Sequence, residues 1–459
     1  MTTTSFSSLP LAPAILANLD SLGYTDMTPI QAESLPLILE GRDLIAQAKT
    51  GSGKTATFGL GILHKLAAAD FGTQALVLCP TRELADQVAG ELRRLARFAG
   101  NIKTLTLTGG SPIRPQVESL EHGAHIVVGT PGRLIDHIDR GSIDLSKLQT
   151  LVLDEADRMV DMGFMEDVIR IVSACPPKRQ TLLFSATYAE DIRKASARFM
   201  RNPAEVKVES LVDASQIEQH FFEINPDERN AAVAQLLEHF RPASTIAFCN
   251  TKVQVRELAE ELVARGFSAM ALHGDLEQRE RDDVLIQFAN NSCSVLVATD
   301  VAARGLDIAS LAAVINVDVT QDTEVHVHRI GRTGRGQEKG LALNLVAPYE
   351  MRWANLIENY QGKPIRWSDL KTLTPAPGGP LRAPMVTLCI QGGKKDKLRP
   401  GDILGALTGD GGLAKDQVGK IHIAEFASFV ALDRHIAKEA CATLSQGNIK
   451  GKRFRMRLM

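Results

Sequence analysis

The sequence predicts an α/β protein in which two tandem domains with parallel sheets are followed by a small α+β domain. Short apolar runs recur between residues 44 and 346, and they are continuous, which is typical of strands buried on both faces of a parallel sheet. Segments with a helical period separate these runs, and the strand-helix series occurs twice. A proline- and glycine-rich stretch, TLTPAPGGPLRAP at 372–384, then predicts an extended linker before a third, smaller part.

The first series contains five strand candidates, which predict an α/β domain over residues 1–207. They are LIAQ from 44, ALVLCP from 75, HIVVGT from 125, LVLDEA from 151 and TLLFSAT from 181. The segment RELADQVAGELRRLARF lies between two of them, and its apolar residues fall on one helical face: Leu84, Val88, Leu92 and Leu95.

The second series repeats this pattern and predicts an α/β domain over residues 216–370. Its strand candidates are TIAFCN from 245, AMALHGD from 269, SVLVATD from 294, AVINVD from 313 and LALNLV from 341. We expect the junction between the two domains within 205–216, because RNPAEVKVESLVDASQ has no strong helical period.

The linker, residues 371–384, leads to a predicted α+β domain over residues 385–459. Its strand candidates are VTLCIQ, KIHIAEF and SFVAL, and its helix candidates are RPGDILGALTG and RHIAKEACATL.

Length and composition indicate a folded, cytoplasmic protein. At 459 residues and 44% hydrophobic content, the chain is long enough for about three domains with real cores. No apolar stretch reaches 18 residues, and MTTTSFSSLPLAPAI lacks the cationic start and apolar run of an export signal, so we expect no membrane association. The six cysteines are scattered without metal-site spacing, which favours reduced, buried thiols.

The near-neutral total, 52 basic against 54 acidic residues, hides an uneven distribution of charge. From Met385 onward there are 13 Lys and Arg against 7 Asp and Glu, a net of +6, which leaves 39 against 47, or −8, for the rest. The chain ends in IKGKRFRMRLM. Such a split indicates contact with nucleic acid or a membrane surface, although a solvated edge strand whose charges prevent strand pairing remains an alternative.

The segment AKTGSGKT, residues 48–55, has the composition and context of a phosphate-binding loop. It follows a strand candidate and precedes a helix-like run, although Ala48 replaces the usual first glycine. Gly51 and Gly53 let successive backbone N–H groups face the β-phosphate. Lys54 would neutralise the β- and γ-phosphates, and the Thr55 hydroxyl would ligate Mg²⁺.

The segment LVLDEAD places two carboxylates, Asp154 and Glu155, at the end of a predicted buried strand. Beside a phosphate loop, the first can hold Mg²⁺ and the second can orient water for attack on the γ-phosphate. Alone, the motif also fits a solvated helix start whose acidic residues complement the dipole. Its position about 100 residues after the loop, behind its own strand, favours the catalytic interpretation.

The segment HRIGRTGRG, residues 328–336, repeats arginine at every third position: Arg329, Arg332 and Arg335. Guanidinium groups suit phosphate oxygens, and an arginine from a separate domain can stabilise charge in phosphoryl transfer. A solvated basic helix is the alternative, which the interspersed glycines disfavour.

These three segments belong to a longer series through which the chain resembles the DEAD-box RNA helicases over roughly residues 1–365. The motifs stand in family order: GYTDMTPIQ (23–31), AKTGSGKT, PTREL (80–84), GG (109–110), TPGR (130–133), DEAD (154–157), SAT (185–187), IAFCNTK (246–252), HGDLEQRER (273–281), ATDVAARGLD (298–307) and HRIGRTGR (328–335). The resemblance implies two tandem RecA-like domains that hydrolyse ATP with Mg²⁺ and unwind RNA locally.

The resemblance also implies roles for individual residues. Around the nucleotide, Gln31 would read the adenine edge, Tyr24 would pack on its ring and Asp307 would approach the ribose, with Thr50, Gly51, Ser52, Gly53, Lys54 and Thr55 around the phosphates. Catalysis would use Lys54, Asp154, Glu155, Arg332 and Arg335, with Thr55 and Asp154 on the metal, and Ser185 and Thr187 would couple the nucleotide state to RNA. The expected RNA contacts in the two RecA-like domains are Pro80, Thr81, Arg82, Gly110, Thr130, Arg133, Arg281, Thr299 and Asp300.

The third domain resembles the RRM-like, RNA-recognition domain of a bacterial group of these helicases. That group recognises a 23S ribosomal RNA hairpin in the peptidyl-transferase region during assembly of the large, 50S, ribosomal subunit, so we expect pre-50S particles as partners and a monomeric enzyme. The usual RNA-recognition fold stacks bases on aromatic residues of its two central strands. Here the second strand candidate carries Phe426 and Phe429, but the first has no aromatic residue, which argues against ordinary base stacking on the sheet. Phosphate contacts are expected from Lys394, Lys395, Lys397, Arg399, Lys452, Arg453 and Arg455.

Two other functions fit parts of this pattern. A DNA-directed helicase or translocase would share the ATP site, and comparing RNA with matched DNA as activators separates it. A non-enzymatic clamp that ATP locks onto RNA would not need the complete hydrolytic set, and measurable turnover excludes it. A metabolic kinase has no support, because no second small-molecule site is recognisable.

Overall fold

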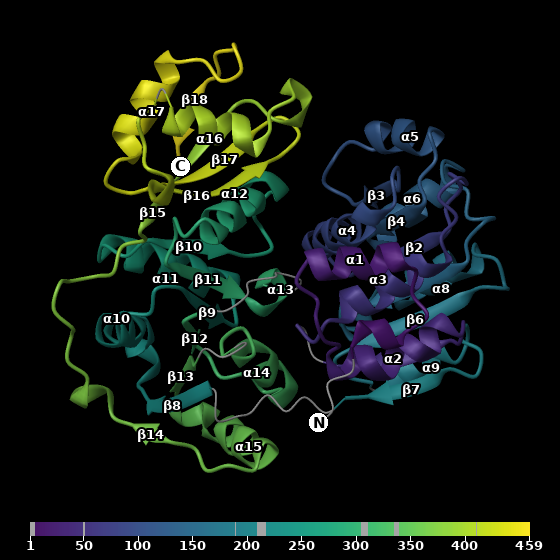
Figure 1. The fold of residues 1–459 in the computed structure, drawn as a ribbon. Coiled ribbons are helices and arrows are strands. Elements are labelled where there is room, and N and C mark those ends of the chain that lie inside the picture. Colours follow the sequence, from purple (N-terminus) through teal and green to yellow (C-terminus); the bar gives the residue numbers. More distant parts are fainter. Residues whose placement is uncertain are drawn as a thin grey trace. The chain divides into compact units, whose positions relative to one another are not determined.

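The computed structural model describes residues 5–48, 51–188, 190–208, 217–303, 311–334, 339–409 and 411–459. These residues form two compact units, one before and one after the 209–216 segment (Figure 1). The first unit holds a seven-stranded sheet, and the second holds a seven-stranded and a four-stranded sheet. The predicted fold class, two α/β domains followed by a small α+β domain, is therefore confirmed.

The sheet of the first unit is parallel throughout, in the order β3-β4-β2-β5-β6-β1-β7. Its strands are β1 (Leu44–Gln47), β2 (Ala75–Leu78), β3 (Thr104–Leu107), β4 (Ile126–Gly129), β5 (Thr150–Asp154), β6 (Gln180–Ser185) and β7 (Ala204–Lys207). The helices are α1 (Pro13–Ser21), α2 (Pro29–Leu39), α3 (Lys54–Lys65), α4 (Arg82–Leu95), α5 (Arg114–Glu121), α6 (Pro131–Asp139), α7 (Ala156–Asp161), α8 (Met165–Ser173) and α9 (Glu190–Ser196).

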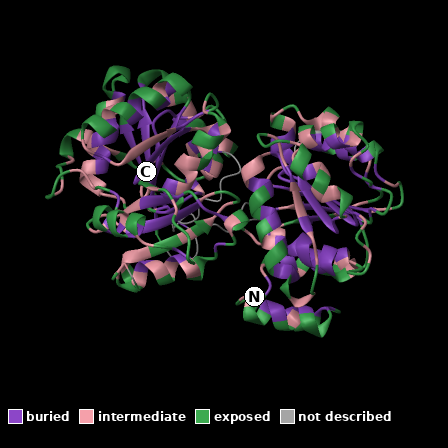
Figure 2. Cartoon of the chain, turned by 90° about the horizontal axis from the view of Figure 1, so that it is seen from above, coloured by how far each residue is buried: buried purple, intermediate pink, exposed green. Residues whose placement is uncertain are grey.

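The five predicted strands of this domain are all present, and the two that the sequence missed, β3 and β7, are the edge strands. An edge strand is partly exposed, so it lacks a continuous apolar run. Residues 204–207 pair with β1 and belong to the sheet, so the start of the predicted junction, 205–216, overlaps the end of β7. Two hydrophobic cores form on the sheet, and Figure 2 shows buried strands with exposed outer helix faces.

The larger sheet of the second unit is also parallel, in the order β10-β11-β9-β12-β13-β8-β14. Its strands are β8 (Ile217–Glu223), β9 (Thr245–Cys249), β10 (Ala269–Leu272), β11 (Val295–Thr299), β12 (Ala313–Asn316), β13 (Gly340–Val346) and β14 (Trp367–Ser368). Its helices are α10 (Arg229–Phe240), α11 (Lys252–Ala264), α12 (Gln278–Ala289), α13 (Asp300–Ala303), α14 (Thr323–Ile330) and α15 (Met351–Gln361). Strand β8 was not predicted, because the polar run Glu218–His220 interrupts its apolar residues.

The C-terminal domain is an antiparallel sheet in the order β16-β17-β15-β18 with two helices. In chain order it contains β15 (Met385–Ile390), α16 (Pro400–Thr408), β16 (Val418–Ile423), β17 (Ser428–Asp433), α17 (Ala437–Gln446) and β18 (Met456–Leu458). Phe426 lies in the turn between β16 and β17, so the prediction that it lies on a strand is wrong. Part of the cationic tail does form an edge strand, β18, while residues 450–455 precede it.

The face of this small sheet that points away from its own core contacts the preceding α/β domain. The Thr387 hydroxyl, fully buried, receives a hydrogen bond from Asn290 Nδ2 at 3.2 Å and lies 2.8 Å from Ser292 Oγ. Arg457 of β18 lies 3.9 Å from Asp283 of α12. On the same face, Phe429 is only 7% exposed. Both faces of the four-stranded sheet are therefore covered at these positions.

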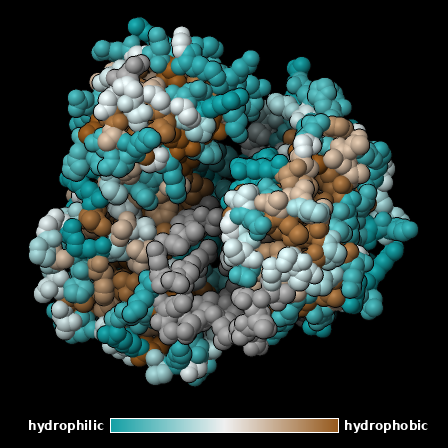
Figure 3. Space-filling view, viewed as in Figure 1, coloured by the Kyte–Doolittle hydropathy of each residue, from teal (hydrophilic) through white to brown (hydrophobic). Residues whose placement is uncertain are grey.

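The predicted linker runs along the second α/β domain. The backbone N–H of Ala376 donates to Glu238 O at 3.0 Å, and that of Ala383 donates to Ser268 Oγ at 3.1 Å. Figure 3 shows hydrophilic side chains over much of the visible surface, with hydrophobic ones in smaller groups. Among the described helices, none is long and apolar enough to cross a membrane.

Candidate ATP and RNA sites

The strand order of the first unit separates two groups of predicted site residues. All strands are parallel, so the loops that follow them meet at one edge of the sheet. The phosphate loop and the two predicted catalytic carboxylates follow β1 and β5, and the coupling residue Ser185 ends β6 between them. Thr81, Gly110 and Thr130 follow β2, β3 and β4, which form the other half of the sheet. In this sheet, the predicted phosphate-site and RNA residues thus occupy adjacent halves of one edge.

The phosphate-binding loop lies at the start of α3, where unpaired N–H groups favour an anion. Gly51 and Gly53 have φ values of 82° and 95°, a region that suits glycine. The Lys54 ammonium is buried, at 7% exposure, and donates to Ala48 O at 3.0 Å. Thr50 lies outside the described residues.

The two predicted catalytic carboxylates lie at the junction of β5 and α7. Asp154 is 3% exposed, and its Oδ1 has no hydrogen-bond partner among the described residues. Burial raises the pKa of Asp154 to about 7; the nearby Lys54 ammonium opposes this rise, and Glu155 adds to it. Glu155 has φ of 55°, a strained value for a residue with a side chain, and forms a buried ion pair with Arg158 Nε at 3.0 Å. Sequence reasoning missed Arg158.

Asp157, the last residue of DEAD, connects this loop to the end of β6. Its N–H donates to Ser185 Oγ at 3.2 Å, and its Oδ2 accepts the N–H groups of Ala186 and Thr187 at 3.2 and 3.3 Å. Three hydrogen bonds thus join the DEAD and SAT segments. Ser185 contributes its side chain, whereas Thr187 contributes its backbone.

The predicted adenine reader, Gln31, is buried at 1% exposure, and its amide bonds to the protein itself. Its Oε1 accepts the Thr28 N–H at 2.8 Å, and its Nε2 donates to Gly53 O at 3.3 Å. The Thr28 hydroxyl donates to Ser52 O at 2.7 Å. Gln31 thus also supports the phosphate loop, which its motif alone did not predict. Tyr24 is half-buried and donates its hydroxyl to Glu91 Oε1 at 2.7 Å.

The predicted RNA residues of the first unit lie close together. Arg82 Nη2 would lie only 3.0 Å from a side chain at Gly109, next to Gly110, so the arginine lies against that loop. Arg133 Nη2 donates to Ser111 O at 3.0 Å, while its buried Nη1 has no hydrogen-bond partner among the described residues. An unpaired guanidinium N–H suits a phosphate oxygen.

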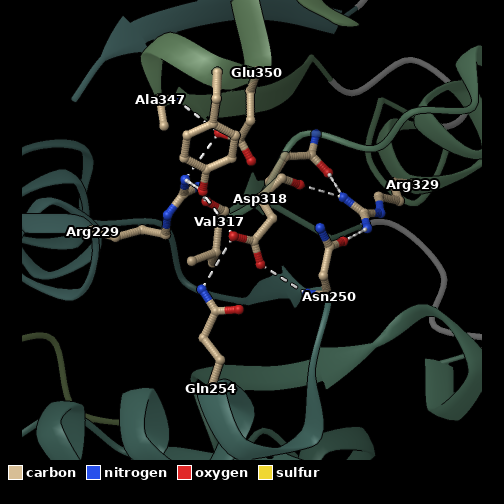
Figure 4. Close-up of polar contacts among 10 residues, drawn as sticks. Arg229, Asn250, Gln254, Val317, Asp318, Arg329, Ala347 and Glu350 are labelled. Carbon is tan, nitrogen blue, oxygen red and sulfur yellow. Dashed lines mark hydrogen bonds and ion pairs between the residues drawn. The ribbon is translucent and has the colours of Figure 1, made fainter. Parts of the chain in front are cut away.

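In the second unit, Arg329 organises the loops after β9, β11 and β12. Its side chain is 1% exposed and binds both carboxylate oxygens of Asp300, at 2.7 and 2.6 Å. It also donates to Asp318 O at 2.7 Å and to Asn250 Oδ1 at 3.3 Å, contacts that Figure 4 shows in part. The carboxylate of Asp300, a predicted RNA contact, is therefore an acceptor for Arg329.

A buried ion-pair cluster extends this arrangement (Figure 4). Asp318 Oδ2 accepts the Asn250 N–H at 2.8 Å, and Oδ1 lies 3.2 Å from Arg229 Nη1. Arg229 Nη2 donates to Glu350 Oε2 at 2.9 Å, and the same oxygen accepts the Ala347 N–H at 2.8 Å. Sequence reasoning missed this cluster, because its charged residues are far apart in the chain and belong to no recognisable motif.

The remaining predicted residues of this domain are partly described. Arg281 on α12 donates to Ala302 O at 3.3 Å, and Thr299 ends β11. Arg332 follows α14 and is 7% exposed. Asp307 and Arg335 lie outside the described residues. In the C-terminal domain, the seven predicted cationic contacts are all exposed: Lys394, Lys395, Lys397, Arg399, Lys452, Arg453 and Arg455.

Comparison with known families assigns each of these regions. Residues 28–195 match the DEAD/DEAH box helicase domain, residues 228–337 the helicase conserved C-terminal domain, and residues 387–458 the DbpA RNA binding domain. The ATP-dependent RNA helicase DbpA of Escherichia coli is 52% identical over 99% of this chain and all of its own length. The chain belongs to the DEAD-box RNA helicases. It is accordingly an ATP-dependent RNA helicase with RNA-dependent ATP hydrolysis.

Other members of the DEAD-box family resemble the chain over its first two domains. CshA of Listeria monocytogenes is 44% identical over 83% of this chain and 73% of its own length. Dbp5 of Saccharomyces cerevisiae bound to RNA and ADP BeF3 superposes with a TM-score of 0.72 at 32% identity, covering 80% of this chain and 96% of that one. These relatives support two RecA-like domains in this chain.

Proposed function

We propose that this helicase locally unwinds 23S ribosomal RNA during assembly of the 50S subunit, and that residues 385–459 select the RNA. Support for the target comes from the match to the DbpA RNA binding domain over 387–458 and from the 52% identity with Escherichia coli DbpA. The helicase domains would contact phosphates and 2′-hydroxyls without reading sequence. Selection of one RNA therefore requires a separate surface, and the C-terminal domain supplies a cationic one.

The ATP site uses Mg²⁺ in this proposal. Magnesium is commonly held by one or two carboxylates together with substrate phosphates, and the unpartnered Asp154 Oδ1 at the end of β5 suits this role, with the Thr55 hydroxyl. The bound ion would offset charge on the phosphates. Lys54 would exchange its bond to Ala48 O for the phosphates, and Glu155 would orient the attacking water.

Hydrolysis is coupled to RNA through Asp157 in this proposal. A shift of the β5–α7 junction on ATP binding would move the backbone of Ala186 and Thr187, because both donate to Asp157 Oδ2. ATP and RNA would each favour a closed state that Arg332 and Arg335 complete, so their affinities must be coupled reciprocally. Local strand displacement follows closure, and phosphate release reopens the enzyme.

The observation that carries this proposal is the complete set of DEAD-box residues in one chain with a DbpA-type RNA-binding domain. The test is steady-state ATP hydrolysis with no RNA, with RNA lacking ribosomal sequence, and with a 23S fragment containing the peptidyl-transferase-region hairpin. Selective stimulation by the fragment is expected. Equal stimulation by any RNA would be consistent with helicase activity but would refute the selection of 23S RNA. Stimulation by matched DNA would favour a DNA-directed enzyme.

A further inference from the structure

Three segments meet at one end of the four-stranded sheet. Ile390 pairs with both Ser428 and Met456, and Ser428 also pairs with Ile423. The segments next to these residues, 391–402, 424–427 and 450–455, must therefore lie at the same end. Hydrogen bonds join them: Lys394 N–H donates to Ala424 O at 2.9 Å, and Lys450 Nζ donates to Lys397 O at 3.0 Å. We call these three segments the cationic end.

The cationic end carries a large excess of positive charge. It contains eight basic residues, all exposed, and three acidic ones, which leaves a net of +5. Its acidic groups already have partners: Glu425 lies 3.3 Å from Lys395 Nζ, Asp402 lies 3.6 Å from Lys450 Nζ, and Asp396 accepts the Gly393 N–H at 3.2 Å. The surface therefore favours a polyanion.

An exposed aromatic ring lies at this end. Phe426 is 70% exposed, and no other large hydrophobic side chain in the described part of 385–459 is exposed. The ring is carried by an ordered turn, because Ala424 N–H donates to Ala427 O at 2.8 Å. A side chain at Gly393 would come within 2.5 Å of Ala424 O, so the neighbouring segment packs directly against the turn. An apolar ring exposed among cations is the combination that binds unpaired nucleotides.

The usual alternative, stacking of bases on the sheet, is blocked at the described positions of the two central strands, β15 and β17. The sheet face opposite the core is covered where Thr387 contacts Asn290 and Ser292, and Phe429 on that face is 7% exposed. The β16–β17 turn lies beyond the strands and keeps its ring accessible.

We propose that Phe426 stacks on one unpaired base of a folded RNA, while the cationic end binds the phosphates on either side. This site rests on the proposed function and adds to it a specific nucleotide contact. The turn, Ala424–Ala427, contains no other aromatic residue, and Phe454 of the cationic end packs against the domain core, so Phe426 provides the stacking surface.

The test compares Phe426→Ala and Phe426→Trp in the full chain, measuring affinity for the hairpin fragment over a range of salt concentrations. Phe426→Ala is expected to bind about tenfold more weakly. The slope of log affinity against log salt is expected to stay unchanged, because no phosphate contact is lost. Phe426→Trp retains binding. Lys452→Ala, by contrast, is expected to lower that slope by about one counterion.

The stacked base is found with RNAs that carry a single abasic nucleotide at each loop position. At one position, wild type loses about tenfold and Phe426→Ala loses nothing further, because both changes remove the same contact. Tyr360→Ala is the control, since this residue is 57% exposed on α15 of another domain. Its affinity should equal that of wild type.

Two outcomes overturn the proposal: Phe426→Ala binds as tightly as wild type, or every abasic position weakens both proteins equally. Loss of the proposed function looks different, because wild type itself would then bind the 23S fragment no better than unrelated RNA. In that case the same comparison on the unrelated RNA decides whether the ring stacks.

Discussion

Asp318 is predicted to control RNA binding through Arg329, and Asp318→Asn tests this. The substitution keeps an oxygen for the Asn250 N–H but removes the charge opposite Arg229, whose side chain is 6% exposed. Breaking a buried pair completely costs about 3–5 kcal/mol. Here Arg229 keeps Glu350, so we expect a loss of about 2 kcal/mol in the free energy of unfolding, which corresponds to a hydrogen bond to a charged group.

The functional effect arises because Arg329 bonds to the backbone of Asp318 and to the side chains of Asn250 and Asp300. Loosening Asp318 should displace Arg329 and thereby Asp300, a predicted RNA contact. Residues in one hydrogen-bond network couple by about 0.5–3 kcal/mol, so the RNA concentration for half-maximal ATPase stimulation should rise about tenfold. Steady-state ATP hydrolysis against RNA concentration measures this rise.

Glu350→Gln is the matched control. The substitution should lower the free energy of unfolding by about 2 kcal/mol, because it weakens the ion pair with Arg229. Glu350 itself contacts neither Asn250 nor Arg329 in the described structure. Urea unfolding should show similar destabilisation for both variants, whereas only Asp318→Asn should shift the half-saturating RNA concentration. Equal shifts for the two variants, or no shift for Asp318→Asn, would refute the positioning role and leave the cluster with a purely structural one.

Three further predictions concern the ATP site and the C-terminal domain. Glu155→Gln should lower ATP turnover about 100-fold or more, because it removes the group that orients the attacking water. Nucleotide binding, measured with a fluorescent ATP analogue, should be retained. Unchanged turnover would exclude this role. Burial raises the pKa of Asp154 from 3.8 to about 7. Between these two values the folded protein holds a proton that the unfolded chain has lost. The free energy of unfolding of the ligand-free protein should therefore fall by up to about 4 kcal/mol between pH 4 and 7. Asp154→Asn should abolish that fall in urea titrations, and an identical pH profile would contradict the assignment. Thr387→Val should leave Asn290 and Ser292 without their buried hydrogen-bond partner and weaken the docking of the C-terminal domain by about 1–3 kcal/mol. Faster proteolysis within 371–384 would report this loss. Thr443→Val, at an exposed position of α17, is the control.

The fold was predictable where burial is complete on both faces of a strand. The central strands, such as β2 and β5, are continuous apolar runs, and the sequence located them closely. The edge strand β3 is only half-buried at two of its positions, β7 carries exposed residues, and β8 contains Glu218–His220, so composition alone predicts loops there. The docking of the C-terminal domain depends on Thr387 and Asn290, 97 residues apart, and no local pattern encodes such a pair.

The residues of the candidate site also differ in how far the sequence predicts them. Residues within short motifs, such as Lys54 and Glu155, were identified because the motif and its position after a predicted strand together indicate the role of the residue. Supporting residues were missed when their partners are distant in sequence: Arg229 reaches Asp318 and Glu350 across 89 and 121 positions. Arg158 was missed although it is local, because its ion pair with Glu155 depends on the left-handed backbone at Glu155.

Helix α12 contacts the C-terminal domain and also carries a predicted RNA residue of the second α/β domain. Arg281, a predicted RNA contact, donates to Ala302 O, while Asp283, two positions later, lies near Arg457 of the C-terminal domain. Residues two positions apart point to different sides of a helix, so one helix contacts both regions. Arg457 pairs with Cys389, next to Ile390 at the cationic end of the sheet, so α12 reaches the C-terminal domain close to the surface proposed to bind RNA.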